Sequence, residues 1–391
     1  MLTMQDSNTF QTRKRIALGM SGGVDSSLAA HLLVEQGFDV TGVFLECWRA
    51  PGCRSEEDRA DALKVALSLN IPFRVLDFKS AYKQKVVEYF FDEYQAGRTP
   101  NPDVLCNKEI KFGLFLDWAL DEGFDAIATG HYAQVLPSTA NHPAQLTIPK
   151  DTRKDQTYFL YLLTQNQLDK CHFPLAQMTK QEVRTAAQQR AIHVSNKKDS
   201  VGICFIGDIN VHDFLKDRLG ENPGDVIDIH GRKIGTHKGL WFYTIGQRHG
   251  FSVDSSIKDL LPSGEIVNKH LIPPFYVLAK RATTNQLVVG FGSETFVQAF
   301  YVHSLHWIQP PDMTLPLKVR IRHTGALLAC HVHTSDMVSH VEVELSQPAQ
   351  GIAPGQSAVF YQQAPQSEAM ICLGGGIITA PEESLAQSSK S

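Results

Sequence analysis

Hydrophobic and polar positions alternate in two periods along the first third of the chain. Short apolar runs occupy residues 16–20, 40–45, 73–78 and 126–129, and amphipathic patterns of helical length lie between them, over residues 28–34, 56–69, 81–95 and 108–122. Strands that alternate with helices in this way predict an α/β fold with a doubly wound parallel sheet. In such a sheet ligands bind beyond the carboxyl ends of the strands.

The pattern changes twice further along the chain. Residues 137–149 are polar and contain Pro143, which indicates a loop or hairpin, a helix is expected over residues 157–164, and Thr179 with Glu182 predicts a capping box at the start of another helix. After residue 222 the sequence becomes β-rich and is interrupted by glycines. We therefore expect a first domain over residues 1–210, a small middle domain over 211–274, a C-terminal β-barrel domain over 275–380 and a disordered tail over 381–391.

One loop has the composition of a phosphate site. Ser21-Gly22-Gly23-Val24-Asp25-Ser26-Ser27 follows the first apolar run and leads into the first helical pattern. Two glycines allow close approach of the backbone, the serines add donors, and the helix supplies free N–H groups. The loop lacks the lysine of a Walker motif and the glycine spacing of a dinucleotide fold. It resembles the PP-loop of ATP pyrophosphatases, and the alternative is an ordinary Gly/Ser turn.

Composition narrows the class of protein. The chain has 391 residues, 43% of them hydrophobic and 20% charged, a size that suggests two or three domains. No apolar run approaches the roughly 20 residues of a membrane span, so we expect a cytoplasmic protein with no membrane partner. Seven scattered cysteines without Cys-x-x-Cys spacing predict neither a disulfide framework nor a zinc ribbon. The net charge of -4 argues against general coating of nucleic acid but permits a local basic face.

Two cysteines lie in segments that suggest chemistry. Cys106 ends the segment 97–106, which contains two prolines, and it precedes the helix expected to begin near Lys108. A thiol at that end of a helix, close to Lys108 and Lys111, would favour the thiolate. Cys204 lies in an Ile-Cys-Phe-Ile run that follows two lysines. Each cysteine also has an ordinary interpretation, as an inert loop thiol and as a small buried apolar residue.

Together these segments resemble the bacterial-type tRNA 2-thiouridylases, members of the PP-loop ATP pyrophosphatase superfamily. The resemblance covers almost the whole chain, over residues 19–27, 97–111, 128–132, 154–160, 197–207, 244–248, 354–361 and 372–378. It implies an enzyme that uses ATP to place sulfur on C2 of the wobble uridine, position 34 of tRNA. The fold implied is a PP-loop domain followed by a middle domain and a C-terminal β-barrel.

The resemblance also assigns roles around ATP and sulfur. ATP is expected at Gly19, Met20, Ser21, Gly22, Gly23, Val24, Asp25 and Ser26, with Leu45 and Gly130 near the nucleotide. Magnesium would neutralise the phosphates, and Asp25, the only carboxylate of the loop, is the candidate ligand. Cys204 would receive sulfur as a persulfide from a sulfur carrier protein. Cys106 would act as nucleophile or resolving thiol, and the two cysteines would end as a disulfide.

Contacts with tRNA follow from the same resemblance. They fall on Asn101, Pro102, Asp103, His131, Lys154, Asp155, Gln156, Arg320, Ile321 and Gln356. Asp103 would also orient the flipped uracil or accept its N3 proton. Lys318, Arg320 and Arg322 share one face of a predicted strand, which suits a phosphate backbone. The family commonly has Arg-Tyr where this chain has Arg320-Ile321, so aromatic stacking is not expected there.

Three rival hypotheses remain open. An iron-sulfur cluster ligated by Asp103, Cys106 and Cys204 would change the sulfur chemistry. A PP-loop amidotransferase or ligase would adenylate a small molecule, which leaves Cys106, Cys204 and the β-rich half unexplained. A non-catalytic RNA-binding protein would retain only the nucleotide fold. A further departure from the family is the pair Cys47 and Cys53, in a stretch that is usually acidic, for which the sequence suggests no role.

Overall fold

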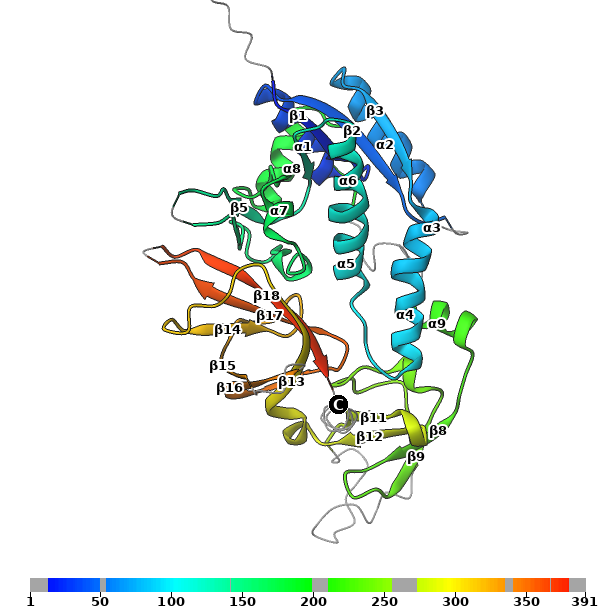
Figure 1. The fold of residues 1–391 in the computed structure, drawn as a ribbon. Helices are drawn as coiled ribbons and strands as arrows, with labels where there is room; N and C mark the ends of the chain where they lie inside the picture. Colours follow the sequence, from blue (N-terminus) through cyan, green and yellow to red (C-terminus); the bar gives the residue numbers. More distant parts are fainter. Residues whose placement is uncertain are drawn as a thin grey trace, which may run out of the picture.

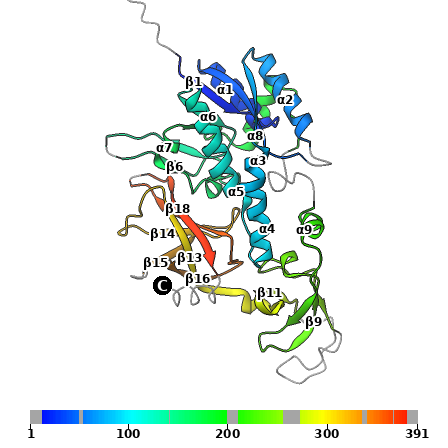
Figure 2. The ribbon, with the colours of Figure 1, turned by 45° about the vertical axis from the view of Figure 1, so that its right-hand side comes forward.

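The computed structural model describes residues 13–49, 54–140, 142–198, 210–254, 273–334, 340–365 and 367–379. Figure 1 shows an α/β domain at the top, a barrel below it and a smaller sheet beside the barrel. Helix α4 runs from the first domain down to the smaller sheet in both views (Figures 1 and 2). The middle and barrel domains therefore both lie on the same side of the first domain.

The first domain contains the expected doubly wound sheet. Its five strands are all parallel, in the order β3-β2-β1-β4-β7. They are β1 (Arg15–Gly19), β2 (Asp39–Glu46), β3 (Phe73–Asp77), β4 (Ala126–Thr129) and β7 (Cys171–His172). Since β1 lies between β2 and β4, the order reverses at β1, and the loop after β1 lies where such sheets bind ligands. The parallel α/β fold predicted from the alternating pattern is confirmed.

Helices cover this sheet and connect its strands. They are α1 (Val24–Glu35), α2 (Ser55–Ser68), α3 (Lys79–Tyr82), η1 (Lys83–Val87), α4 (Glu88–Gln95), α5 (Pro102–Leu105), η2 (Cys106–Leu114), α6 (Phe115–Asp121), η3 (Thr157–Phe159), α7 (Gln165–Leu168) and α8 (Lys180–Gln189). The predicted capping box of Thr179 and Glu182 is present at α8. The helix expected over 157–164 is wrong, since the structure forms only the single turn η3 before α7.

The helical run from Pro102 corrects one expectation about Cys106. We expected a helix to begin near Lys108, after Cys106, but α5 begins at Pro102 and continues into η2 and α6. Proline is favoured at the first helical position, where its fixed φ suits the helix and no N–H is needed. Cys106 therefore lies in the second turn and not at the positive end of the helix.

The middle sheet is larger than the sequence suggested. It contains β10 (Ser252–Val253), β9 (Lys233–His237), β8 (Gly224–Ile227), β12 (Gln286–Gly290) and β11 (Tyr276–Arg281) in that order, preceded by α9 (Val211–Leu219). Turns η4 (Leu240–Phe242) and η7 (Ala282–Thr284) connect its strands. β12 pairs with β8 in parallel. The middle sheet thus ends at Gly290 rather than at residue 274, because long-range pairing, which local pattern does not show, adds β11 and β12 to it.

The C-terminal domain is the expected β-barrel. Six antiparallel strands follow one another as β13-β16-β15-β14-β17-β18, and the pairing of β13 with β18 closes the ring. They are β13 (Phe296–Trp307), β14 (Leu317–Arg320), β15 (Leu328–Thr334), β16 (His340–Gln350), β17 (Ser357–Gln363) and β18 (Met370–Thr379), and η8 (Gly292–Thr295) precedes them. The region 137–149 is indeed spanned by a hairpin, β5 (Gln134–Leu136) and β6 (Gln145–Thr147), and β6 pairs with β18.

Candidate functional site

The PP-loop lies between β1 and α1 and has the geometry of an anion site. Its hydroxyls are held inside the loop: Ser26 Oγ accepts from Ser21 N at 3.1 Å, and Ser27 Oγ donates to Gly23 O at 2.8 Å. Gly23 is the N-cap of α1 and provides no side-chain cap. The first N–H groups of α1 have no intrahelical acceptor, so an anion would satisfy them and gain from the helix dipole.

Two glycines are required by close approaches around this loop. Gly22 has φ +72°, and a Cβ there would lie 2.1 Å from Asp58 O in α2. Gly130 directly follows β4, and a Cβ there would lie 2.8 Å from Ser26 N. The segment after β4 thus packs directly against the PP-loop, and Gly130 lies beside the residues expected to hold the nucleotide. A backbone cradle of this kind fits the phosphates of a nucleotide.

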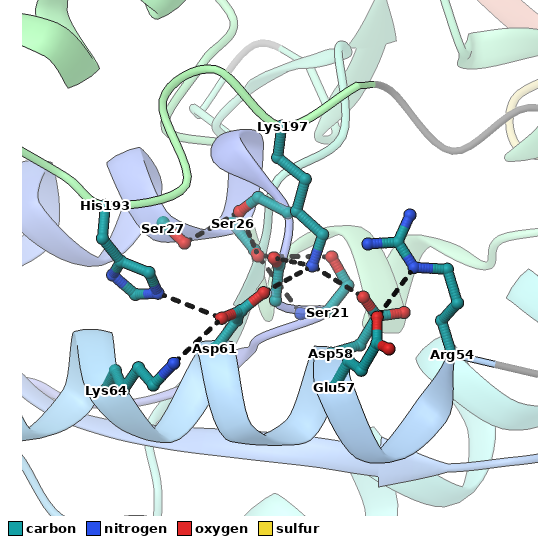
Figure 3. A network of polar contacts seen from close by, with 12 residues as sticks. Ser21, Ser26, Ser27, Arg54, Glu57, Asp58, Asp61, Lys64, His193 and Lys197 are labelled. Atoms are coloured by element: carbon teal, nitrogen blue, oxygen red, sulfur yellow. Dashed lines mark hydrogen bonds and ion pairs between the residues drawn. The ribbon is translucent and has the colours of Figure 1, made fainter.

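Lys197, to which the sequence assigned no role at the nucleotide, contacts the PP-loop on the side of α2 (Figure 3). Its ammonium donates to Gly22 O at 3.0 Å, to Asp58 at 2.7 Å and to Asp61 at 2.8 Å. Burial lowers the pKa of Lys197, but the two carboxylates outweigh burial and raise it. His193 also approaches Asp61, at 3.3 Å. Because C=O and N–H of a trans peptide point in opposite directions, holding Gly22 O here turns Gly23 N–H away from α2.

Asp25 is already engaged by two groups that sequence reasoning also missed. Lys180 Nζ lies 2.8 and 2.7 Å from its two carboxylate oxygens, and Tyr132 OH donates to Oδ1 at 2.8 Å. The capping box at Thr179 places residue 180 at the start of α8, but it does not indicate which loop that residue faces. The ammonium therefore supplies, from α8, a positive charge beside a loop that has no lysine of its own.

The other nucleotide candidates lie around the same edge of the sheet. Gly19 ends β1, and Met20 is buried and donates its N–H to Val43 O at 2.8 Å. Leu45 lies near the end of β2, next to β1. Gly19, Leu45 and Gly130 thus come from three adjacent strands that end together. The residues expected at the nucleotide are brought together by the fold.

Cys106 lies in an apolar environment below this edge. It is 1% exposed and belongs to a cluster with Tyr82, Phe90 and Ile110. Cys204 lies in residues 199–209, outside the described part of the chain, so the expected pairing of the two thiols stays a prediction. The next residue after Cys106, Asn107, donates from Nδ2 to Phe159 O at 3.2 Å, which ties the helical run to η3.

His323, for which the sequence suggested no role, lies within the electrostatic influence of Asp103. Burial lowers the pKa of His323. The hydrogen bond to the Asp155 carbonyl and the negative charges of Asp155 and Asp103 raise it by a smaller amount. The His323 ring lies 4.3 Å from the Phe159 ring, between centroids, and its Nε2 is 2.9 Å from Asp155 O. His323 thus connects the barrel to residues 155–159 of the first domain.

Most of the predicted tRNA residues take part in contacts between or within domains. Asp155 and Arg320 form an ion pair of 2.5 Å whose side chains are 2% and 9% exposed, and Ile321 beside them is buried. Gln356 Nε2 donates to Thr99 O and Pro100 O at 2.8 and 3.2 Å.

Gln156 accepts from Tyr132 N at 2.8 Å. Lys154 and Asp103 are half-buried, as is Asn101, while Pro102 is buried. Their part in tRNA binding stays a prediction.

His131 is enclosed by the first domain. Burial, with a smaller contribution from Lys111, holds the pKa of His131 well below its ordinary value of 6.5. Its Nε2 lies 3.5 Å from the ammonium of Lys111, which only donates, and its Nδ1 lies 2.7 Å from Thr129 Oγ1. A neutral ring that accepts from Lys111 at Nε2 would carry its proton on Nδ1 and donate it to Thr129.

A pocket of about 280 Å³ opens where the first domain meets the barrel. It is lined by Thr152, Arg153, Asp155, Arg320, His323, Thr324 and Gly325. Arg153 is 90% exposed on its rim, and Arg320 Nε is buried there without a hydrogen-bond partner in the part of the chain that the structure describes. The pocket thus combines the exposed Arg153 with a polar interior formed by Asp155, Arg320 and His323.

Within the described ranges, no group of three or more His, Cys, Asp and Glu side chains is placed to hold a metal ion. Cys204, one of the three ligands of the alternative iron-sulfur cluster, is not among these residues. None of the described helices combines the length and apolar character needed to cross a membrane.

Comparison with known proteins identifies the family. Three family models match in succession: a "tRNA methyl transferase HUP domain" over residues 14–208, a "tRNA methyl transferase PRC-barrel domain" over 212–291 and an "Aminomethyltransferase beta-barrel domain" over 297–378. The tRNA-specific 2-thiouridylase MnmA of Blochmanniella floridana is 42% identical over 377 residues, 93% of this chain and 96% of the relative. The chain belongs to the tRNA-specific 2-thiouridylase family. The tRNA-specific 2-thiouridylases of Pseudomonas fluorescens (strain Pf0-1) and Listeria monocytogenes serotype 4a (strain HCC23) are 40% and 41% identical, over 95% and 93% of this chain and 96% and 94% of the relatives.

In this 2-thiouridylase family member the candidate site has two parts. The PP-loop with Lys180 and Lys197 lies at the edge of the parallel sheet, and the helical run that carries Asp103 and Cys106 follows the segment at Thr99 and Pro100 that Gln356 of the barrel contacts. The two lysines and His323 escaped sequence reasoning because each acts through a partner far away in the chain. Lys180 and His323 lie outside the motifs that carry the resemblance. Lys197 lies in one of these motifs, but no role was assigned to it.

Proposed function

We propose that this protein catalyses ATP-dependent 2-thiolation of the uridine at position 34 of tRNA. The observation that carries the proposal is the sequence identity of 42%, over 93% of this chain, to a protein named for this activity. The PP-loop at the start of α1 and the helix that carries Asp103 are both present in the structure. ATP would lie on the uncapped N-terminus of α1. The tRNA would bind where the first domain meets the barrel, with the target base near Asp103.

The chemistry needs activation because the C2 carbonyl of uracil is urea-like and has no leaving group. Transfer of AMP from ATP to the C2 oxygen releases pyrophosphate and makes that oxygen part of a leaving group. The terminal sulfur of a Cys204 persulfide then forms the C2–S bond, either directly or after Cys106 releases it as hydrosulfide, and AMP departs. Attack of Cys106 on the persulfide leaves a Cys106–Cys204 disulfide, which a reductant must open.

Magnesium fits this site on one condition. It would neutralise the phosphate charge, and Asp25 is the carboxylate of the loop that would hold it. Both oxygens of Asp25 are bonded to Lys180, so an ion held by Asp25 would compete with this ammonium for the carboxylate. An ammonium displaced from Asp25 would remain beside the loop, where it could pair with a phosphate.

The decisive experiment is nucleoside analysis of unmodified tRNA incubated with the protein, ATP, magnesium and a sulfide or persulfide source. We expect 2-thiouridine and release of pyrophosphate. Cys106→Ser and Cys204→Ser should abolish 2-thiouridine while tRNA binding persists, and Cys330→Ala, which removes a buried thiol of the barrel, should leave thiolation unchanged. Folded protein that binds tRNA but forms no 2-thiouridine would overturn the proposal.

The same assay separates the rival hypotheses. Iron and sulfide analysis after anaerobic purification tests the cluster, since an iron-free protein that thiolates tRNA requires none. Pyrophosphate release that depends on tRNA excludes a ligase of small molecules and a non-catalytic RNA-binding protein. Sulfur supplied by a carrier protein, rather than by free sulfide, should label Cys204 first, and a Cys204→Ser variant that still accepts persulfide sulfur would contradict that order.

A further inference from the structure

Lys280 in β11 has an unusual environment. Its ammonium lies 2.9 Å from Tyr243 O and 3.5 Å from Thr99 Oγ1, and within the described part of the chain both of these partners are neutral oxygens. Burial lowers the pKa of Lys280 to about 7. Among the described residues no carboxylate accompanies this half-buried ammonium, and withdrawing it from water costs free energy, so a purely structural position would be served better by an apolar side chain.

The position that Lys280 reaches is where all three domains meet. Thr99 belongs to the first domain, and its N–H donates to Pro354 O of the barrel at 2.9 Å while its carbonyl accepts from Gln356 Nε2 at 2.8 Å. A Cβ on Gly355 would lie 2.9 Å from Thr99 N and O, so the barrel packs closely against it. Thr99 is thus held by the barrel on its backbone and by the middle domain on its side chain.

Thr99 also lies immediately before the catalytic segment. Pro100 separates it from Asn101, the N-cap of the helical run that carries Asp103 and Cys106. Two prolines at 100 and 102 restrict the backbone between Thr99 and this helix. The position of Thr99 therefore constrains where the helix that carries Asp103 and Cys106 begins.

The motif at residues 244–248, for which the sequence analysis found no role, supports the other end of this contact. Gly246 N donates to Val277 O and Val277 N donates to Gln247 O, both at 2.8 Å, which fixes the turn onto β11. Gln247 Oε1 accepts from Thr244 N at 3.1 Å and closes the turn. This arrangement presents Tyr243 O, the carbonyl that precedes the motif, to Lys280.

We propose that Lys280 is a positioning residue for thiolation, which joins the middle domain to Thr99 and so sets the placement of the Asp103–Cys106 segment relative to the bound uridine. The proposal rests on the proposed function. In this proposal the 244–248 turn and the middle sheet hold Lys280 in place and so affect the reaction, although neither contributes a reacting group. Misplacement of reacting groups by about 1 Å can cost about a hundredfold in rate.

The test compares Lys280→Met, which keeps the length of the side chain and removes the amine, with Lys233→Met. Lys233 lies in the same sheet, is exposed and pairs with Asp225, so it controls for loss of a lysine in this domain. For each variant we would measure the melting temperature, the Kd values for ATP and tRNA, and the single-turnover rate of 2-thiouridine formation. The wild-type protein in the same assay tests the proposed function independently.

For Lys280→Met we expect a melting temperature at least as high as that of the wild type, Kd values within threefold, and a rate lowered at least tenfold. Thr99→Val should lower the rate similarly, and the double variant should be no slower than Lys280→Met alone, because both changes break one contact. A rate within twofold of the wild type would overturn the inference, as would additive effects or a loss that follows melting temperature. Absence of thiolation in the wild type would instead refute the proposed function.

Discussion

Lys180 at the start of α8 places its ammonium 2.8 and 2.7 Å from the two carboxylate oxygens of Asp25, a residue 155 positions earlier in the chain. The two side chains are 13% and 31% exposed, so water screens the pair only partly. Removing either partner takes away an opposite charge that lies at hydrogen-bond distance from the other in a partly enclosed site. We expect Asp25→Asn and Lys180→Met each to lower the free energy of unfolding by about 1–2 kcal/mol.

A denaturant double-mutant cycle checks this pair. The double variant, which removes both charges, should be less destabilised than the sum of the single variants. Lys150→Met provides a control, since Lys150 pairs with Glu182 on the same helix α8 but is exposed and does not reach Asp25. If the loss of stability in the double variant equals the sum of the losses in the single variants, the pair contributes nothing to stability.

Gly22 has both a positive φ and a close backbone contact, whereas Gly37 has only the positive φ and can serve as a control. Gly37 also has positive φ, +85°, but an added Cβ there meets nothing within 4 Å, whereas at Gly22 it would lie 2.1 Å from Asp58 O. Gly37→Ala should therefore cost only the backbone strain, about 1–2 kcal/mol. Gly22→Ala should cost more and also weaken ATP binding, as measured by chemical denaturation and titration calorimetry. Equal effects of the two substitutions would show that α2 yields to the added methyl group.

The Asp155–Arg320 ion pair joins the first domain to the barrel and is almost completely buried. Asp155→Asn should lower the free energy of unfolding by about 3–5 kcal/mol, because it leaves the Arg320 guanidinium buried without its counter-ion. Calorimetry should then show the barrel melting apart from the first domain. Arg153→Met, on the same loop with its side chain 90% exposed, should leave the melting curve unchanged. An Asp155→Asn protein that melts like the wild type would contradict the structural role of the pair.

The pH dependence of stability should carry a signature of His131. Its pKa in the folded protein lies well below 6.5, whereas in the unfolded chain it returns to the ordinary value, so the unfolded chain binds more protons between these two values. Stability is therefore complete above pH 6.5 and decreases as the pH falls below it. Melting temperatures of the wild type and His131→Gln between pH 5 and 8 test this. The variant should lose less stability on acidification, and identical pH profiles would show that His131 is solvated in the folded state.

Local periodicity in the sequence was enough to predict much of the fold. The strands β1 to β4, the alternation of strands and helices around them, the capping box at Thr179, the β5–β6 hairpin and the barrel follow from alternation, turn residues and caps, whereas β7 and the start of the helical run at Pro102 were not predicted. The helix expected over 157–164 failed because Thr157 and Tyr158 are buried against the barrel, where Thr157 Oγ1 meets Tyr361 OH at 3.0 Å. Tertiary contacts there outweigh the helical pattern.

The parts of the site that escaped prediction depend on pairs distant in sequence. The resemblance named Asp25, Asp155 and Arg320, but no local signal connects Asp25 to Lys180 or Asp155 to Arg320. Likewise β11 and β12 look like barrel strands until β12 pairs with β8. The sequence motif was enough to predict an anion site at the PP-loop. The charged side chains around that loop could be identified only from the folded structure.

The pairing of β6 with β18 places a hairpin of the first domain on the sheet of the barrel. Backbone hydrogen bonds therefore cross from one domain to the other, in addition to side-chain contacts. A protein shortened before β13 would leave β6 as an uncovered edge strand, open to pairing with other molecules, and would be expected to aggregate. The boundary at which this chain could be divided for separate expression is consequently not the linker before the barrel.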